Sequence, residues 1–459
     1  MRSPDALQHR RAPVLPLFRM ALRQLMGGRA LWTLLLLTCP LVGYSYFQAV
    51  SLYGEASAAA RQSPIIATGL SPLDGVLVPS FGAAYVAITL LFPFVAIRTL
   101  GNEKETDAIW ILVQLPYRVA TLVGVKFAAV LAAWVLASIP ALSVLVLWSA
   151  SGGHLSAPET SNLVLGHLLY GSLIGAIALF AAAVAESAAT AAIVALAFTI
   201  GSWVLDFTLA GQPGLVEWIA RLSLTQILRP FEQGLLSAGV VLGALAAICG
   251  FLVLARVWIR LGTATRTKLV QSGTCVAITA LLVAGLSQIK LSKDVSEDRR
   301  NSFSLADERA LAALRERLVI TVHLTTEDPR YVDLRRNVLA KLERIMPNVS
   351  IRLASGRQLF GTPSKDDRYG EIEIVYGARS DITRSTSPRE ILPIIYGLAS
   401  GAPPAPISGG EYPGYPLIIN GASALVWFLC GLPLLIAILW WWSRRPPSTH
   451  RFMLKEVSS

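Results

Sequence analysis

Charged residues are scarce in this chain. Only 15% of its 459 residues are Asp, Glu, Lys or Arg, whereas an average soluble domain has roughly 25%. Hydrophobic residues make up 54% of the chain, which argues against a soluble protein and indicates several membrane-spanning segments. The net charge of +11 fits this class, because cytoplasmic loops of membrane proteins collect Lys and Arg. No basic stripe with interleaved aromatic residues occurs, so we expect no binding to nucleic acid.

Catalytic and metal-binding motifs are also missing. The chain has no G-x-x-x-x-G-K-[ST] phosphate-binding loop and no H-E-x-x-H, C-x-x-C or G-x-S-x-G motif. Its five histidines are scattered, and no pair has the spacing of metal ligands. The four cysteines lie apart in apolar runs and do not suggest a disulfide framework. We therefore expect no catalytic, cofactor-binding or metal-binding residues, and no enzyme activity from this chain's own residues.

Long apolar runs are what the chain has in abundance. Each run is long enough to cross a bilayer core of ~30 Å at about 1.5 Å per helical residue. The fourth and fifth runs are separated only around Glu186 and Ser187, so this boundary is the weakest of the set. Eight spans are predicted, near residues 31–50, 80–98, 122–148, 162–185, 187–207, 236–258, 270–289 and 417–442.

The fold class expected from this pattern is a predominantly α-helical polytopic membrane protein with a small extracytoplasmic α/β domain between its last two helices. Before the first span, Phe18, Ala21, Leu22 and Leu25 are spaced i, i+3, i+4, i+7 and predict a helix in the membrane interface. The expected division is a basic amphipathic segment (1–29), six spans (30–260), a seventh span (261–290), the α/β domain with its linker (291–416), an eighth span (417–442) and a tail (443–459).

The distribution of Lys and Arg predicts the orientation. With the N-terminus inside, the inner segments hold 18 of these residues and the short outer loops hold three, Arg61, Arg221 and Arg229. This asymmetry follows the positive-inside rule, which long loops need not obey. Both termini are therefore expected in the cytoplasm and residues 291–416 outside it. Trp440, Trp441 and Trp442 would anchor the inner end of the last span.

The segment 291–416 reads as water-soluble, with 19 Lys or Arg and 17 Asp or Glu in residues 290–416. Apolar and polar residues alternate in parts of it, which predicts strands. Helical periodicity occurs between them, and this order favours a small α/β domain. The expected strands are Val319–Leu324, Val349–Leu353 and Glu371–Tyr376, and the expected helices are Pro329–Ile345 and Pro388–Ala399.

The stretch Arg98–Lys126 is the one strongly charged segment among the first spans. Its acids Glu103, Glu105 and Asp107 would suit a helix N-terminus, where the helix dipole favours negative charge, and Pro116 would end that helix. The stretch resembles the segment after span 2 of ABC-2-type permeases in Glu103-Lys104-Glu105-Thr106, in Leu112, Leu115 and Pro116, and in Gly124 and Lys126. It departs from that family at Asp107-Ala108, where the family usually has Gly-Thr.

This resemblance implies that a separate cytoplasmic ATPase drives a permease through the helix in this stretch. The residues that it assigns to the contact are Glu103, Lys104, Glu105, Asp107, Trp110, Leu112 and Pro116. A second stretch, Leu222–Leu236, looks like the outer hairpin of the same permeases, which dips into the membrane and gates the exit. The residues that match there are Phe231, Gln233 and Gly234, and Arg229 is assigned to the same hairpin.

A third stretch, Asp294–Leu305, resembles the start of the auxiliary domain in gliding-motility-type ABC transporters. The loop is too short for a full-length auxiliary protein, so only its first α/β portion is expected. Together the resemblances imply a permease subunit of an ABC transporter, an exporter by our reading, fused to a shortened auxiliary domain. Its partners would be the ATPase, which holds ATP and Mg²⁺, a second permease copy or paralogue, and the bilayer of the bacterial inner membrane.

Two other classes of function remain open at this stage. An ion-coupled secondary transporter would want ionisable groups near the middle of its spans, often in matching halves, and the sequence shows neither. A non-transporting scaffold would use its outer domain to dock a cell-surface machine. The residues identify neither the substrate nor the direction of transport.

Overall fold

The molecule was analysed as a computed structural model, which describes residues 14–63, 67–114, 117–209, 223–260, 262–289, 291–325, 328–354, 368–401, 403–404 and 412–444. Within these ranges, eight helices are long and apolar enough to cross a membrane. All eight coincide with the predicted spans, and the chain is a multi-pass membrane protein. The weakest predicted boundary is confirmed, because one helix ends at Val184 and the next begins at Ala188.

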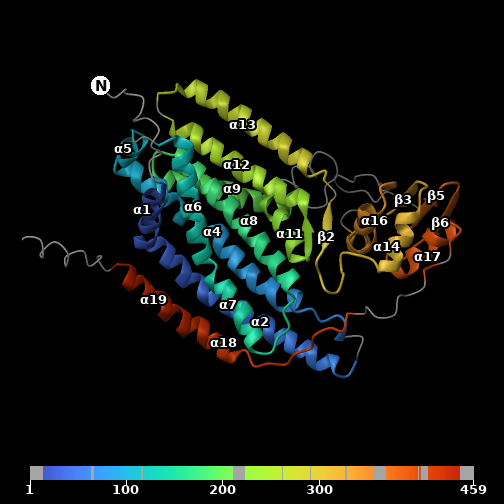
Figure 1. Cartoon of the computed structure of the whole chain (residues 1–459). Helices are drawn as coiled ribbons and strands as arrows, with labels where there is room; N and C mark the ends of the chain where they lie inside the picture. The colour runs from blue at the N-terminus through green and yellow to red at the C-terminus, as the bar shows by residue number, and fades with distance from the viewer. Residues whose placement is uncertain are drawn as a thin grey trace, which may run out of the picture.

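The spans form a bundle of long helices, with α4 and α8 at its centre (Figure 1). Two of the first six spans are composite, because α4 continues the π-helical turn η2 and α7 continues α6 after a break at Ser138. Three shorter helices accompany the bundle: α1 (Val14–Gly27), α5 (Ala108–Gln114) and α11 (Leu224–Glu232). The first six spans are α2 (Arg29–Ala60), η2–α4 (Leu73–Leu77 and Val78–Glu105), α6–α7 (Val119–Ala137 and Ile139–Ala150), α8 (Ala157–Val184), α9 (Ala188–Leu209) and α12 (Ala238–Ile259).

Small residues let the central helices approach one another closely. A Cβ atom added to Gly171 of α8 would lie 1.7 Å from the indole nitrogen of Trp134 on α6, and one added to Gly175 would lie 2.8 Å from Val130. Such small-xxx-small pairs drive association of helices in lipid, where hydrophobic burial does not favour helix contact over lipid contact. The Gly171–Gly175 pair therefore serves packing inside the bundle.

The last two spans lie on opposite flanks of the six-helix bundle (Figure 1). The seventh, α13 (Thr265–Leu286), lies against α12, where Gly250 leaves room for Thr279. The eighth lies against α2, where Gly43 leaves room for the ring of Phe428. It is built from α18 (Ala422–Val426), the π-helical turn η4 (Trp427–Gly431) and α19 (Leu432–Ser443).

Between these two spans the chain forms an α/β domain beyond one end of the bundle (Figure 1). Its sheet has the order β4-β3-β5-β6, with β3 parallel to β4 and antiparallel to β5. Alternate residues of β3 and β5 are buried and pack with the helices in a core of its own. The elements are α14 (Leu305–Ala313), β3 (Leu318–Val322), α15 (Pro329–Leu334), η3 (Arg335–Leu339), α16 (Ala340–Ile345), β4 (Val349–Leu353), β5 (Ile372–Tyr376), β6 (Arg379–Thr383) and α17 (Pro388–Leu398).

The strands and helices expected in this domain are all present, but three elements were not expected. These are α14, the edge strand β6, and a two-stranded ribbon outside the main sheet. In the ribbon, β1 (Leu235–Ser237) follows α11 and pairs antiparallel with β2 (Ser292–Asp294), which follows α13. The ribbon joins the six-span core to the start of the α/β domain.

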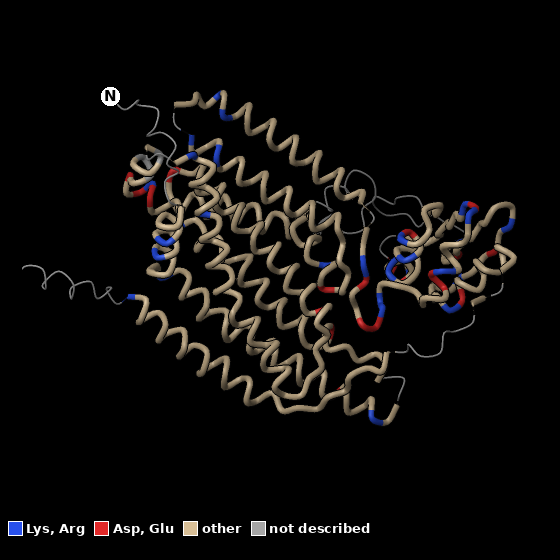
Figure 2. Tube along the Cα trace, viewed as in Figure 1, with Lys and Arg blue, Asp and Glu red and all other residues tan. Residues whose placement is uncertain are grey.

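Charge separates the two ends of the molecule from the spans between them (Figure 2). Lys, Arg, Asp and Glu gather at the end that carries α1 and α5, which we call the α5 end, and in and near the α/β domain, which marks the α/β end. The predicted amphipathic helix at residues 18–25 is confirmed as α1. Its residues Leu17, Ala21 and Leu25 are buried, whereas Arg19 and Arg23 are exposed.

Candidate functional site

At the α5 end, helix α4 runs on to Glu105, and α5 begins only at Ala108. Between them Asp107 has a left-handed backbone (φ 55°), a conformation that is uncommon for residues other than glycine but is tolerated by Asp. The expectation that the three acids open a helix is therefore wrong for Glu103 and Glu105, which lie in the last turn of α4. The charged stretch is also not one continuous helix.

Glu103 is turned into the bundle, where it meets Lys126 of α6. The Lys126 ammonium lies 2.6 Å from the Glu103 carboxylate, and the two residues are only 2% and 3% exposed. The ammonium also donates to the carbonyl of Thr99 at 2.6 Å. A buried charge without a partner is costly, so this pair ties the end of α4 to α6. Glu103 does not lie on the surface that a partner protein would meet.

Lys104 ties α4 to a third helix. Its ammonium donates to the carbonyls of Ala183 and Ala185 at 2.7 and 2.8 Å. These carbonyls lie at the C-terminus of α8, where helix carbonyls lack partners within the helix and the helix dipole attracts a cation. The last turn of α4 is thereby held to α6 through Glu103 and to α8 through Lys104.

Beyond this fixed turn, the surface is formed by the α4–α5 turn and by α5. Glu105 and Asp107 are exposed, and Ile111 on α5 is 67% exposed. The opposite side of α5 is anchored, because Leu112 is buried against Leu17 of α1 and Leu122 of α6. The side chain of Trp110, like Pro116, lies outside the described part of the chain.

The α5 end thus combines an exposed surface on α5 and its turn with a firmly bonded end of α4 behind it. An apolar side chain and two acids face outward from α5 and its turn. Behind them, the end of α4 is joined to α6 by a buried ion pair and to α8 by the partly buried bonds of Lys104. No group of three or more potential metal ligands occurs among the described residues, so the α5 end shows no metal-binding chemistry there.

At the α/β end, the predicted hairpin residues surround the turn from α11 to β1. Phe231 is fully buried, and its ring fills the space that Gly166 of α8 leaves free. Asn162 of α8 donates to the Phe231 carbonyl at 3.1 Å. Gly234 has a positive φ of 74°, which a glycine adopts without strain. Arg229 is exposed. The four predicted hairpin residues therefore lie close together in the chain, but they do not form one exposed surface.

The segment that follows β2, residues 294–303, folds back onto this turn, and we call it the rim segment. The Asp294 carboxylate accepts bonds from Ser296 and from the backbone amide of Asn301, which closes the segment into a loop. The Asn301 side chain donates to the carbonyl of Gln233 at 2.6 Å. The amide of Val295 donates to the carbonyl of Gly234 at 2.9 Å.

Arg300 fastens the rim segment to the start of the second span. Its guanidinium donates to the Ser71 hydroxyl at 2.7 Å and forms ion pairs with Asp74 and Asp298. The side chain is only 10% exposed, and burial alone would lower its pKa. Its bonds to the two carboxylates more than offset this effect and raise the pKa of Arg300 above its ordinary value.

His154, in the turn between α7 and α8, contacts the chain both before and after the α/β domain. Its Nε2 atom lies 2.9 Å from the Glu297 carboxylate of the rim segment, and its ring stacks on Tyr415, with centroids 3.7 Å apart. The Tyr415 carbonyl in turn accepts a bond from the Tyr53 hydroxyl of α2 at 2.7 Å. The amide of Glu297 donates to Glu159 of α8 at 2.7 Å.

Sequence reasoning singled out the stretch that contains the rim segment, but it assigned no contacts to Glu297 or Arg300. It gave no role to His154 or Tyr415. The dense run of charges from Asp294 to Arg300, three acids followed by two arginines, was the available signal, since such a cluster beside an apolar span needs partners. No protein-family model, curated protein or solved structure matches this chain.

Proposed function

We propose that this protein is the membrane-spanning permease subunit of an ATP-binding cassette exporter, driven by a separate cytoplasmic ATPase. The observation that carries the proposal is the α5 end. A short helix with an outward apolar residue and adjacent acids follows directly on α4, whose last turn is bonded to α6 by the buried Glu103–Lys126 pair and to α8 by Lys104. This suits an element that receives force from a partner and transmits it to the spans as a rigid body.

The orientation proposed for the bundle in the membrane follows from the charge distribution. The excess of Lys and Arg in the segments at the α5 end favours that end for the cytoplasm, where ATP is available. The chain itself has no phosphate-binding loop, so the energy source must be another subunit. The α/β domain would then lie outside the cytoplasm, over the exit from the bundle.

The structure narrows the proposed contact surface. Glu103 and Lys104 would act indirectly, by holding the end of α4, whereas Glu105, Asp107 and Ile111 would meet the ATPase. On the other side of the membrane, the buried Phe231 would keep α11 seated on α8, and the Gly234 turn would link this hairpin to the rim segment.

Purification of the tagged full-length chain from its native membranes tests the proposal. We expect a P-loop ATPase to copurify in stoichiometric amount, and its ATPase activity to depend on the permease. The double substitution Glu105→Lys and Asp107→Lys should reduce copurification at least tenfold. Glu55→Lys, an exposed charge reversal near the other end of α2, is the matched control and should have no effect.

Two results would contradict the proposal. One is that chemical crosslinking before extraction captures no P-loop protein on the wild-type chain. The other is that the control substitution weakens the association as much as the double substitution does. A secondary transporter would show ion-driven substrate movement in liposomes that contain this chain alone.

A further inference from the structure

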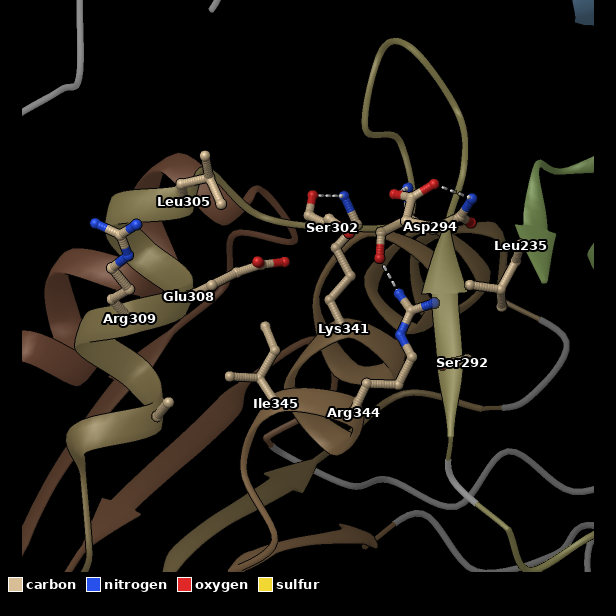
Figure 3. A pocket seen from close by; sticks show the side chains of 12 residues that line it. Leu235, Ser292, Asp294, Ser302, Leu305, Glu308, Arg309, Lys341, Arg344 and Ile345 are labelled. Carbon is tan, nitrogen blue, oxygen red and sulfur yellow. Dashed lines mark hydrogen bonds between the residues drawn. The ribbon is translucent and has the colours of Figure 1, made fainter. Parts of the chain in front are cut away.

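A cavity of about 340 Å³ lies at the junction of the ribbon and the α/β domain. Figure 3 shows its walls: α14 on one side, α16 behind, and β2 with Leu235 of β1 on the other side. We call it the rim cavity. Asn301 and Ser302 of the rim segment also line it, so it lies where the six-span core meets the inserted domain.

Two cations reach into the rim cavity from α16 (Figure 3). Lys341 is 8% exposed, and its ammonium donates to the carbonyl of Ser302 at 3.0 Å. The Arg344 guanidinium donates to the carbonyl of Asn301. Both acceptors are neutral backbone oxygens. Among the described residues, neither cation has a carboxylate within ion-pair distance.

The two acids at the rim cavity have partners of their own. The Asp294 carboxylate accepts bonds from Ser296 and from the amide and side chain of Asn301. Glu308 of α14 forms an ion pair with Arg299 at 3.3 Å. Negative charge is therefore present near the cations, but it is bound to other donors.

The donors of the two cations are mostly unused. An ammonium has three N–H groups and a guanidinium has five. Each side chain donates one hydrogen bond to the described residues, and the Lys341 ammonium also lies over the Phe303 ring. Burial lowers the pKa of Lys341, and the positive charge of Arg344 lowers it further. Lys341 is buried and Arg344 is half-buried, and a buried cation is stabilised by a charged partner. An anion between them would supply both the charge and the missing acceptors.

Apart from Ser292 and the exposed Arg309, the remaining lining is apolar. Leu235, Leu305 and Ile345 face the same space, and Leu305 is 48% exposed. A free inorganic anion would leave these side chains uncovered, whereas a ligand with an apolar portion would cover them.

We propose that the rim cavity binds the anionic group of an amphipathic ligand, a phosphate or a carboxylate, through Lys341 and Arg344, with its apolar portion against Leu235, Leu305 and Ile345. The bound ligand bridges the six-span core and the α/β domain. This assignment does not depend on the function proposed above, because it rests on the cavity alone. The same chemistry is offered by the headgroup of an anionic lipid and by a soluble phosphate compound.

Binding to the purified full-length chain in a neutral detergent distinguishes the sources. The probes are dihexanoyl phosphatidylglycerol, dihexanoyl phosphatidylcholine and sodium phosphate, titrated by thermophoresis. We expect saturable binding of phosphatidylglycerol at least tenfold tighter than that of phosphatidylcholine. Equal binding of sodium phosphate would show that an apolar portion contributes nothing, and would overturn the amphipathic assignment in favour of a small soluble anion. Equal binding of the two lipids, or no saturable binding of any probe, would overturn the proposal.

Substitutions then locate the site. Lys341→Met and Arg344→Met should each weaken binding at least tenfold. Lys341→Arg, which keeps the positive charge, should bind as the wild type does. Arg336→Gln removes an exposed cation from η3, the turn that precedes α16, and should leave binding unchanged. An equal loss with Arg336→Gln would show that only net charge matters and would contradict the assignment.

One measurement needs no substitution. Hydrogen exchange of the wild-type chain, with and without saturating phosphatidylglycerol, should show slower exchange in α14 and α16 and no change in α5. Protection that is absent from α14 and α16 while binding is saturated would place the ligand elsewhere and overturn the proposal.

Discussion

The bundle and the α/β domain are stabilised in different ways. In the α/β domain, alternate strand residues are buried in an apolar core, and the helices α14, α15 and α17 are capped by the side chains of Ser304, Asp328 and Ser387. In the bundle, α2, α6, α8 and α12 have no such cap bond. The bundle relies instead on glycine contacts and on a few buried polar bonds.

The difference follows from the surroundings of each region. Water makes burial of apolar surface favourable, so the α/β domain gains stability from its core and needs only caps to satisfy its helix ends. Lipid offers no such gain between helices, and close packing and internal hydrogen bonds must supply the specificity. The comparison predicts where each region is vulnerable.

The largest loss of stability is expected in the bundle, on substitution of Lys126. Replacing Lys126 by Met leaves the Glu103 carboxylate buried without its cation, which should cost about 3–5 kcal/mol. Thermal unfolding of the purified chain measures the loss. The double substitution Glu103→Gln and Lys126→Met should recover most of it, and Arg98→Gln on the exposed side of α4 should change stability by less than about 0.5 kcal/mol. A loss in the double variant as large as in Lys126→Met would refute the role of the pair.

This pair also shows what the sequence could not reveal. Hydropathy and alternation located the spans and most of the α/β domain, because those patterns are local. The partner of Glu103 lies 23 positions along the chain on another helix, and local charge suggested a helix start instead of a helix end. The strand β6 was missed because four of its five residues are exposed, which leaves no alternation. The β1–β2 ribbon joins segments that are separated by two whole spans, α12 and α13.

The next effect tests the close packing in the bundle. Gly171→Ala would place a methyl group against the Trp134 indole, and overpacking of this kind costs about 1–3 kcal/mol. Gly124→Ala on α6 is the control, because no atom lies within 4 Å of the added Cβ. The control should be neutral or stabilise by about 0.5–1 kcal/mol. Equal thermal unfolding curves for the two variants would show that the Gly171 contact is not needed.

A third prediction concerns the joint between the two regions. Arg300→Gln removes the ion pairs to Asp74 and Asp298, and bonds to charged groups contribute about 1.5–3 kcal/mol. We expect the α/β domain to loosen from the bundle while both keep their folds. Spin labels on α2 and α17 should show a broader distance distribution. Arg299→Gln, which breaks a contact to Glu308 only, should leave that distribution unchanged, and the idea fails if both variants broaden it equally.

The smallest effect lies on the surface of the α/β domain. Bonds from Arg330 and Tyr369 lower the pKa of Asp328 from 3.8 to about 2. A carboxylate with a lowered pKa stabilises the fold at pH values above its ordinary pKa, and this stabilisation is lost as pH falls. The stability difference between the wild type and Asp328→Asn should be constant from about pH 7 to 5 and should vanish between about pH 4 and 2. Thermal unfolding across this range measures it, and a constant difference down to pH 2 would contradict the assignment.

The glycine contacts of the seventh and eighth spans bear on whether these spans and the α/β domain can be removed from the six-span core. Gly250 of α12 receives Thr279, and Gly43 of α2 receives Phe428, so the six-span core has recesses shaped for both flanking helices. A chain cut after Ile259 would leave these recesses open on two sides of the core. Removal of the last two spans would therefore expose one glycine recess on each flank of the core to lipid, although α13 itself buries no residue against it.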